Sequence, residues 1–238
     1  TTEIYTLSLH DALPISVIVK PAPPTPLTCQ TFLNILFEAG LPKEWATMVA
    51  PENLDLATAL VADKRVGFFS FIGSSGVGWM LRSKLAPGAR CALEHGGVAP
   101  VIVAPDANLD TALPTLAKGG FYHAGQVCVS VQRIFCDAKI AQDVAAGIAA
   151  QADSMKVSDP TLADTDVGPL INHNECDRVA TWVSDAISGG AKLITGGDKI
   201  SDSCYQPTVL FDPPADAKIS TAEIFGPAVC VYPYDNLD

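Results

Sequence analysis

A cysteine set among small residues is the part of this sequence best suited to covalent chemistry. The stretch 121–133 reads Phe-Tyr-His-Ala-Gly-Gln-Val-Cys-Val-Ser-Val-Gln-Arg, and its cysteine is Cys128. Ala124 and Gly125 leave room for a substrate and for backbone N–H groups directed at an oxyanion. Most single cysteines of intracellular proteins are inert buried side chains, and we keep that interpretation for the other six. We expect Cys128 to act as a nucleophile, which requires its thiolate form.

A carboxylate 34 positions earlier could activate the water that a later step of such a reaction needs. Glu94 stands in Leu-Glu-His-Gly-Gly, residues 93–97, at the end of an expected strand over 89–93. The carboxyl ends of parallel strands face the crevice in which α/β sheets bind ligands. A surface glutamate before an ordinary glycine turn would give the same pattern. We expect Glu94 to act as a general base.

A glycine-rich turn follows the expected strand over 67–71 and opens an expected helix over 76–85. It reads Gly-Ser-Ser-Gly-Val-Gly over residues 73–78. This order presents backbone N–H groups and the positive end of a helix to a pyrophosphate. Taken alone, such a turn is a weak signal and is more often an ordinary loop. Gly73, Ser74 and Gly78 are therefore candidates for cofactor contacts.

Strand-like and helix-like segments alternate along the chain from Val17 onward. β-Branched and aromatic runs predict strands, and apolar residues at helical spacing predict helices. The expected strands cover residues 17–20, 47–49, 67–71, 89–93, 101–103, 132–136, 192–195 and 228–232. The expected helices cover residues 28–39, 54–62, 76–85, 109–121, 140–155 and 174–188. Strands joined by helical crossovers are parallel, so we expect an α/β fold with parallel, doubly wound sheets.

Composition excludes several classes of partner. The net charge of −11, with 15 Lys and Arg residues in no dense run, argues against nucleic acid. The seven cysteines are an odd number without a C-x-x-C pair, so we expect neither a disulfide framework nor a metal site. A reducing compartment fits such cysteines, and we expect a cytoplasmic protein. No run of 18 apolar residues occurs, so we expect no membrane span.

The first 16 residues do not continue the alternation and are assigned as a separate, non-native segment. Residues 1–15 match the translation of a widely used short-read sequencing adapter. They also lack the charged start and long apolar core of a signal peptide. The neighbouring His10 and Asp11 would otherwise suggest a catalytic pair. We exclude this segment from the interpretation of the fold.

Deleting residues 1–15 should leave folding and ligand binding unchanged, because nothing in their pattern continues the α/β alternation. Thermal unfolding of the chain with and without them is the measurement. A melting temperature that falls by more than a few degrees on deletion would contradict the assignment.

Four motifs occur in a fixed order between Val17 and the last residue. They are the turn at 73–78, Glu-His-Gly-Gly at 94–97, Gly-Gln-Val-Cys at 125–128 and Glu-Ile-Phe-Gly-Pro at 223–227. In this order they resemble the aldehyde dehydrogenase superfamily, and the last motif is identical to that of the family. The chain departs from the family at Ile72, His95 and Val98, where the family usually has Thr, Leu and Lys.

The resemblance implies the roles of the site residues. Cys128 matches the nucleophile of the family's G-Q-x-C segment, and Glu94 matches the general base that activates the deacylating water. The turn around Gly73, Ser74 and Gly78 matches a segment that contacts the dinucleotide. Lys20 matches the lysine that binds the adenosine ribose.

Two further cofactor contacts follow from the motif at 223–227. Glu223 matches the residue that binds the nicotinamide ribose, and Phe225 matches the residue that packs near the nicotinamide. Pro23 stands where an acidic residue would favour NAD by bonding the ribose 2′-hydroxyl. The cofactor implied is therefore NAD or NADP.

The resemblance also implies a domain organisation and a reaction. Residues 17–95 would form part of a Rossmann-like dinucleotide-binding domain, and residues 96–238 most of a catalytic domain. We expect a fragment that lacks both ends of the family's chain, the whole protein being a homodimer or homotetramer. The expected reaction is non-acylating oxidation of an aldehyde to a carboxylic acid. Two alternatives stay open, a catalytically incomplete dinucleotide-binding fragment and an enzyme that transfers the acyl group to coenzyme A.

Overall fold

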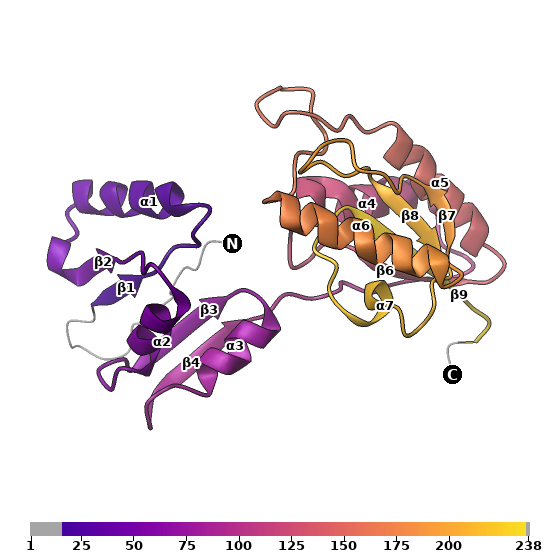
Figure 1. The fold of residues 1–238 in the computed structure, drawn as a ribbon. Coiled ribbons are helices and arrows are strands. Elements are labelled where there is room, and N and C mark those ends of the chain that lie inside the picture. The colour runs from indigo at the N-terminus through magenta and orange to yellow at the C-terminus, as the bar shows by residue number, and fades with distance from the viewer. Residues whose placement is uncertain (1–15, 237–238) are drawn as a thin grey trace. The chain divides into compact units, whose positions relative to one another are not determined.

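The structure is a computed structural model that describes residues 16–236, so residues 1–15 of the segment set aside above lie outside the described residues. The chain divides into two compact units, the first ending at Gly96 and the second beginning at Gly97 (Figure 1). Each unit has a hydrophobic cluster of its own. The two units are therefore treated separately.

The first unit consists of two pairs of parallel strands, each pair joined by a helical crossover. Its elements are β1 (Val17–Val19), α1 (Pro26–Glu38), η1 (Lys43–Trp45), β2 (Ala46–Met48), α2 (Leu54–Ala62), β3 (Phe68–Ile72), α3 (Ser75–Arg82) and β4 (Arg90–Glu94). Among the described residues β1 pairs only with β2, and β3 pairs only with β4. The first unit thus has two short sheets, each with parallel strands as the alternation predicts.

Local signals explain where the helices of this unit begin. Pro26 occupies the first turn of α1, where its missing N–H costs no hydrogen bond. Asn53 precedes α2, and its side-chain oxygen accepts a hydrogen bond from the N–H of Leu56 at 3.0 Å. These signals are local in the sequence, so the bounds predicted for α2 agree with those observed.

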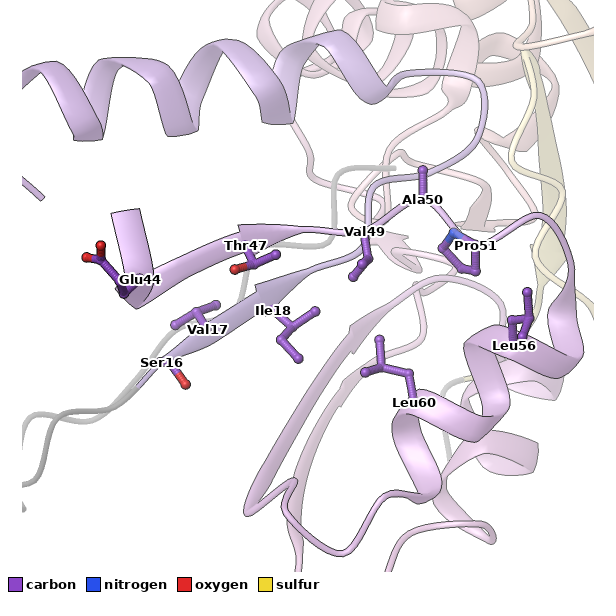
Figure 2. A pocket seen from close by; sticks show the side chains of 10 residues that line it. All are labelled: Ser16, Val17, Ile18, Glu44, Thr47, Val49, Ala50, Pro51, Leu56 and Leu60. Carbon is purple, nitrogen blue, oxygen red and sulfur yellow. The ribbon is translucent and has the colours of Figure 1, made fainter. Parts of the chain in front are cut away.

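An apolar cavity of about 480 Å³ lies between the β1–β2 pair and α2. Figure 2 shows the side chains of Ile18, Val49 and Leu60 directed into it. None of the residues predicted to contact a cofactor lines this cavity. The hydrophobic cluster of the first unit is small and consists of Val61, Phe69, Phe71 and Leu81, with partly buried neighbours around them.

The second unit is built on one five-stranded sheet. Its elements are β5 (Val101–Val103), α4 (Leu109–Phe121), η2 (Tyr122–Gly125), β6 (Arg133–Asp137), α5 (Ala141–Asp153), α6 (His173–Ser188), β7 (Lys192–Thr195), β8 (Thr208–Phe211), α7 (Lys218–Thr221) and β9 (Ala228–Tyr234). The strand order is β5-β6-β9-β8-β7. Helices α4 and α5 cover one face of the sheet and α6 covers the other (Figure 1). This is the doubly wound arrangement that the sequence predicts.

Two features of this sheet differ from the expectation. β7 runs antiparallel to β8, whereas the other neighbouring strands of the sheet are parallel. β8 itself was not predicted, because its four residues form too short an apolar run between Pro207 and Pro213. In the structure Thr208, Val209 and Leu210 are buried between β7 and β9, so tertiary contacts determine this strand.

Two features are absent from residues 16–236. None of their helices combines the length and the apolar character that crossing a membrane requires. Nor do they contain three or more His, Cys, Asp or Glu side chains grouped to bind a metal ion.

Candidate active site

Cys128 lies in a tight turn directly after an unusual stretch of backbone. The N–H of Ser130 donates to the carbonyl oxygen of Val127 at 2.9 Å, which closes the turn, and Cys128 is exposed on it. His123, Ala124 and Gly125 precede this turn with φ angles of 51°, 55° and 69°. Left-handed backbone costs a residue other than glycine roughly 1–2 kcal/mol. Surrounding contacts must therefore stabilise this stretch.

The side chain of Gln126 supplies such contacts. Its Nε2 donates to the carbonyl oxygens of His123 at 3.1 Å and Pro169 at 3.2 Å. Its Oε1 accepts from the N–H of Ile171 at 2.8 Å. One amide thus connects the left-handed stretch to a loop that lies more than forty residues further along the chain. Gln126 belongs to the predicted G-Q-x-C segment, but its partners could not be read from the sequence.

The loop that carries Glu223 packs against the same turn. A side-chain atom added to Gly125 would lie 2.1 Å from the carbonyl oxygen of Gly226, so the two backbones are in direct contact there. Gly97 lies against the carbonyl oxygen of Cys128 and donates its N–H to Oε1 of Glu223 at 3.0 Å. Within the second unit, Cys128 and Glu223 are therefore both neighbours of Gly97.

The environment of Glu223 affects its ionisation. Partial burial raises the pKa of its carboxyl group, and the hydrogen bond from Gly97 and the charge of Arg178 partly counteract this rise. Phe225 follows with a φ angle of 46°, so it joins His123 and Ala124 as a third residue other than glycine in left-handed backbone near the site. The loop from Ala222 to Pro227 has no regular secondary structure, so side chains must satisfy many of its backbone polar groups.

Two polar residues near this loop were not predicted as site residues. Gln132 is buried and bonds the backbone on both sides of Glu223. Ser130 is also buried, and its hydroxyl has no hydrogen-bond partner among the described residues. Gln132 and Ser130 line a small pocket together with Gly97, Glu223 and Phe225. The signal available in the sequence was a polar residue inside an apolar run, as in Val-Ser-Val-Gln over residues 129–132.

The buried cysteines of the second unit differ from Cys128 in exposure. Burial raises the pKa of the Cys136 thiol to about 12 and that of the Cys230 thiol to about 12. Burial also raises the pKa of Cys176. These three thiols therefore stay protonated at neutral pH and are inert as nucleophiles.

In the first unit the structure brings the predicted base and the glycine-rich turn together. Glu94 ends β4 and is exposed, opposite Ile72 of β3. Its carbonyl oxygen accepts from the N–H of Gly73 at 3.1 Å. Ser74 stands at the N-cap of α3 and makes no side-chain hydrogen bond to it. The first N–H groups of α3 therefore have no capping side chain, which fits a helix end that binds an anion such as a phosphate.

Gly78 and Lys20 each make close contacts within the first unit. A side-chain atom on Gly78 would lie 2.1 Å from Nε2 of His95, so the imidazole packs directly on the backbone of α3. The ring of Trp79 contacts His95 edge-on with centroids 5.3 Å apart. Lys20 is half-buried and donates from Nζ to the carbonyl oxygen of Pro21 at 2.9 Å. The small size of Gly78 is thus explained by packing.

The predicted site residues therefore fall into two groups. Lys20, Gly73, Ser74, Gly78 and Glu94 belong to the first unit, and Cys128, Glu223 and Phe225 belong to the second. Within each group the structure gives the contacts described above.

The second unit, a mostly parallel sheet with helices on both faces, places the chain among the doubly wound α/β proteins. The model of the aldehyde dehydrogenase family matches residues 12–238. The chain therefore belongs to the aldehyde dehydrogenase family. The match begins at residue 12, inside the segment of residues 1–16 that we assigned as non-native.

Known proteins show what the chain resembles. A 3-sulfolactaldehyde dehydrogenase of Priestia aryabhattai is 36% identical over 223 residues, which are 94% of this chain and 46% of the relative. An aldehyde dehydrogenase of Mycobacterium tuberculosis, solved with NAD+, has a TM-score of 0.88 at 30% identity, covering 93% of this chain and 47% of that chain. The chain thus spans about half the length of these relatives.

A third comparison concerns the cofactor. A glyceraldehyde-3-phosphate dehydrogenase of Methanocaldococcus jannaschii, solved with NADP, has a TM-score of 0.85 at 32% identity. The match covers 92% of this chain and 48% of that chain. Solved relatives therefore include both an NAD+ complex and an NADP complex.

Proposed function

We propose that the protein oxidises an aldehyde to a carboxylic acid with NAD or NADP, through a covalent bond to Cys128. The observation that carries this proposal is the exposed Cys128 in a turn that packs, through Gly97 and Gly125, on the loop of Glu223. Membership of the aldehyde dehydrogenase family supports it. The relatives with known names act on different aldehydes, so the proposal extends to the class of substrate only.

Cys128 performs the first step. Its thiolate adds to the carbonyl carbon of the aldehyde, and the carbonyl oxygen takes the negative charge of a thiohemiacetal. A bound nicotinamide dinucleotide would supply the acceptor for the hydride that leaves this carbon, and Cys128 then carries a thioester. Because Cys128 is exposed on its turn, a substrate can reach the sulfur without rearrangement of the core.

Glu94 performs the second step. Its carboxylate takes a proton from a water molecule, whose oxygen attacks the thioester carbon. The carbon–sulfur bond then breaks, the carboxylic acid leaves, and the thiolate of Cys128 is restored. Exposure of Glu94 at the end of β4 supports this role, because a water molecule can reach its carboxylate. A base of this kind favours hydrolysis over transfer to coenzyme A.

Several residues fit the dinucleotide. The uncapped first turn of α3 after Ser74 suits its phosphates, and Lys20 lies in the same unit to bond a ribose. The Glu223 carboxylate, ordered by Gly97, suits the second ribose, and Phe225 suits the nicotinamide. As the resemblance implies, we propose a homodimer or homotetramer as the form of the whole protein. The unpaired cysteines support a cytoplasmic location.

A second candidate is a dinucleotide-binding fragment without complete catalysis. The observation that favours it is that the chain spans 46% of a curated relative. In this case the 238 residues would bind NAD or NADP but would not turn over an aldehyde.

One experiment separates the two candidates. The 238-residue chain and the longest reading frame that contains it are each assayed for NAD(P)H formation with several aldehydes, with and without coenzyme A. The panel includes 3-sulfolactaldehyde and glyceraldehyde 3-phosphate, with a neutral aliphatic aldehyde for comparison. We expect the longer protein to form NAD(P)H and a free carboxylic acid independently of coenzyme A. Cofactor binding without turnover by the 238-residue chain would establish the second candidate for this chain, and absence of turnover by both proteins would overturn the first.

A further inference from the structure

The backbone on both sides of Glu223 is bonded by one buried side chain, that of Gln132. Gln132 is 3% exposed. Its Nε2 donates to the carbonyl oxygen of Ala222 at 2.9 Å, and its Oε1 accepts from the N–H of Ile224 at 3.0 Å. A primary amide has a donor and an acceptor side by side, so it can bond both peptide groups at once.

Gln132 is itself fixed to the central sheet of the second unit. The backbone carbonyl oxygen of Gln132 accepts a hydrogen bond from the N–H of Cys230, in β9, at 2.9 Å. A longer contact of 3.5 Å runs from its Nε2 to the carbonyl oxygen of Ile219 in α7. The side-chain amide therefore connects the sheet to a loop that has no regular hydrogen bonding of its own.

Two arginines also bond the backbone of this loop. Arg133 donates to the carbonyl oxygen of Ala222 at 3.2 Å, and Arg178 donates to that of Ile224 at 2.7 Å. Neither of them bonds the N–H of Ile224, for which Gln132 provides the acceptor. Removing the Gln132 amide would thus leave a buried N–H without a partner and free the Glu223 backbone on one side.

We propose that Gln132 is a positioning residue that sets the place of the Glu223 carboxylate for the ribose of the nicotinamide dinucleotide. The proposal rests on the proposed function, because it assigns that ribose to Glu223. Gln132 does not touch the cofactor in this scheme. It acts through Ala222 and Ile224, and the hydrogen bond from Gly97 to Glu223 reports whether the carboxylate is in place.

The test uses Gln132→Met, which keeps the approximate shape of the side chain and removes both hydrogen bonds. Tyr205→Phe is the matched control, because it removes one partly buried hydrogen bond of a buried side chain, and the acceptor is the carbonyl oxygen of Gly197 and not the Glu223 loop. Gln132→Asn is a second variant that keeps an amide in place but is too short to bond both peptide groups. It serves if the methionine variant does not fold.

The first readout needs no cofactor. In the ¹⁵N-labelled 238-residue chain, the amide resonance of Gly97 should shift with pH as Glu223 titrates, and Glu223→Gln should remove this shift. We expect Gln132→Met or Gln132→Asn to abolish or strongly reduce the shift and Tyr205→Phe to retain it. A Gly97 response unchanged in the Gln132 variants would overturn the proposal.

The second readout is the dissociation constant of NAD+ or NADP+ in the protein that binds it. We expect Gln132→Met to weaken binding about tenfold, the equivalent of one buried hydrogen bond, and Tyr205→Phe to leave it unchanged. Equal weakening in both variants would show a merely structural role and would overturn the proposal. If the wild type binds neither dinucleotide while the Gly97 response depends on Gln132, the proposed function fails and the positioning of Glu223 stands.

Discussion

Replacing Cys128 with alanine should abolish aldehyde oxidation and leave cofactor binding nearly intact. The thiol forms the covalent bond to the substrate, whereas the dinucleotide is bound by other residues. We expect a loss of turnover on the order of 10⁴-fold or more, as for removal of other covalent nucleophiles. The measurements are steady-state NAD(P)H formation and the dissociation constant of the cofactor, both made on the protein that the longest reading frame encodes.

Cys204→Ala is the matched control for this prediction. Cys204 is a free, partly buried cysteine of the same unit, and the proposed mechanism assigns it no role. Its replacement should change turnover by no more than about twofold relative to the wild type, because substitutions of residues without a role in the mechanism have small effects. Turnover of Cys128→Ala near that of the wild type would remove Cys128 from the mechanism.

Glu94→Gln should separate the two steps of the reaction. Hydride transfer needs only the thiolate adduct and the bound dinucleotide, whereas release of the acid needs a base for water. We expect a rapid burst of roughly one NAD(P)H per active site, followed by turnover slowed about 10²- to 10⁴-fold. Rapid mixing of the variant with aldehyde and excess cofactor measures both phases.

Glu52→Gln is a matched control, because Glu52 is an exposed glutamate of the same unit that the mechanism does not use. It should show no burst beyond that of the wild type. If Glu94→Gln loses the burst itself, Glu94 acts earlier, by activating Cys128. If neither phase changes, Glu94 is a structural residue at the end of β4.

Elements with local signals were predictable from the sequence. The side chain of Asn53 caps α2, and the bounds of this helix agree with the prediction. The Leu109–Phe121 helix and the Val101–Val103 strand were likewise predicted correctly. The antiparallel direction of β7 was not predictable, because it depends on pairing with β8, a strand that only its burial in the sheet identifies.

The candidate site shows the same division. Motifs such as Glu-Ile-Phe-Gly-Pro at 223–227 point to residues directly from their letters. The left-handed backbone at His123 and Ala124 has no such signal, since alanine rarely adopts it and histidine, although enriched there, adopts other conformations far more often. The bonds of Gln132 join residues about ninety positions apart in the chain. Contacts of this range follow from the folded sheet and were therefore found only in the structure.

The two short sheets of the first unit have a practical consequence for work with this chain. Among the described residues β1 and β3 each pair with one strand only, so each has an edge with unpaired backbone groups. The exposed side chains of Ile18, Val49 and Leu56 lie in the same unit, around the apolar cavity of Figure 2. Open strand edges beside apolar surface are templates for pairing between chains. Preparations of the chain should therefore lose monodispersity as the protein is concentrated, and measurements on it, the NMR titration included, are best made at the lowest concentration that gives a signal.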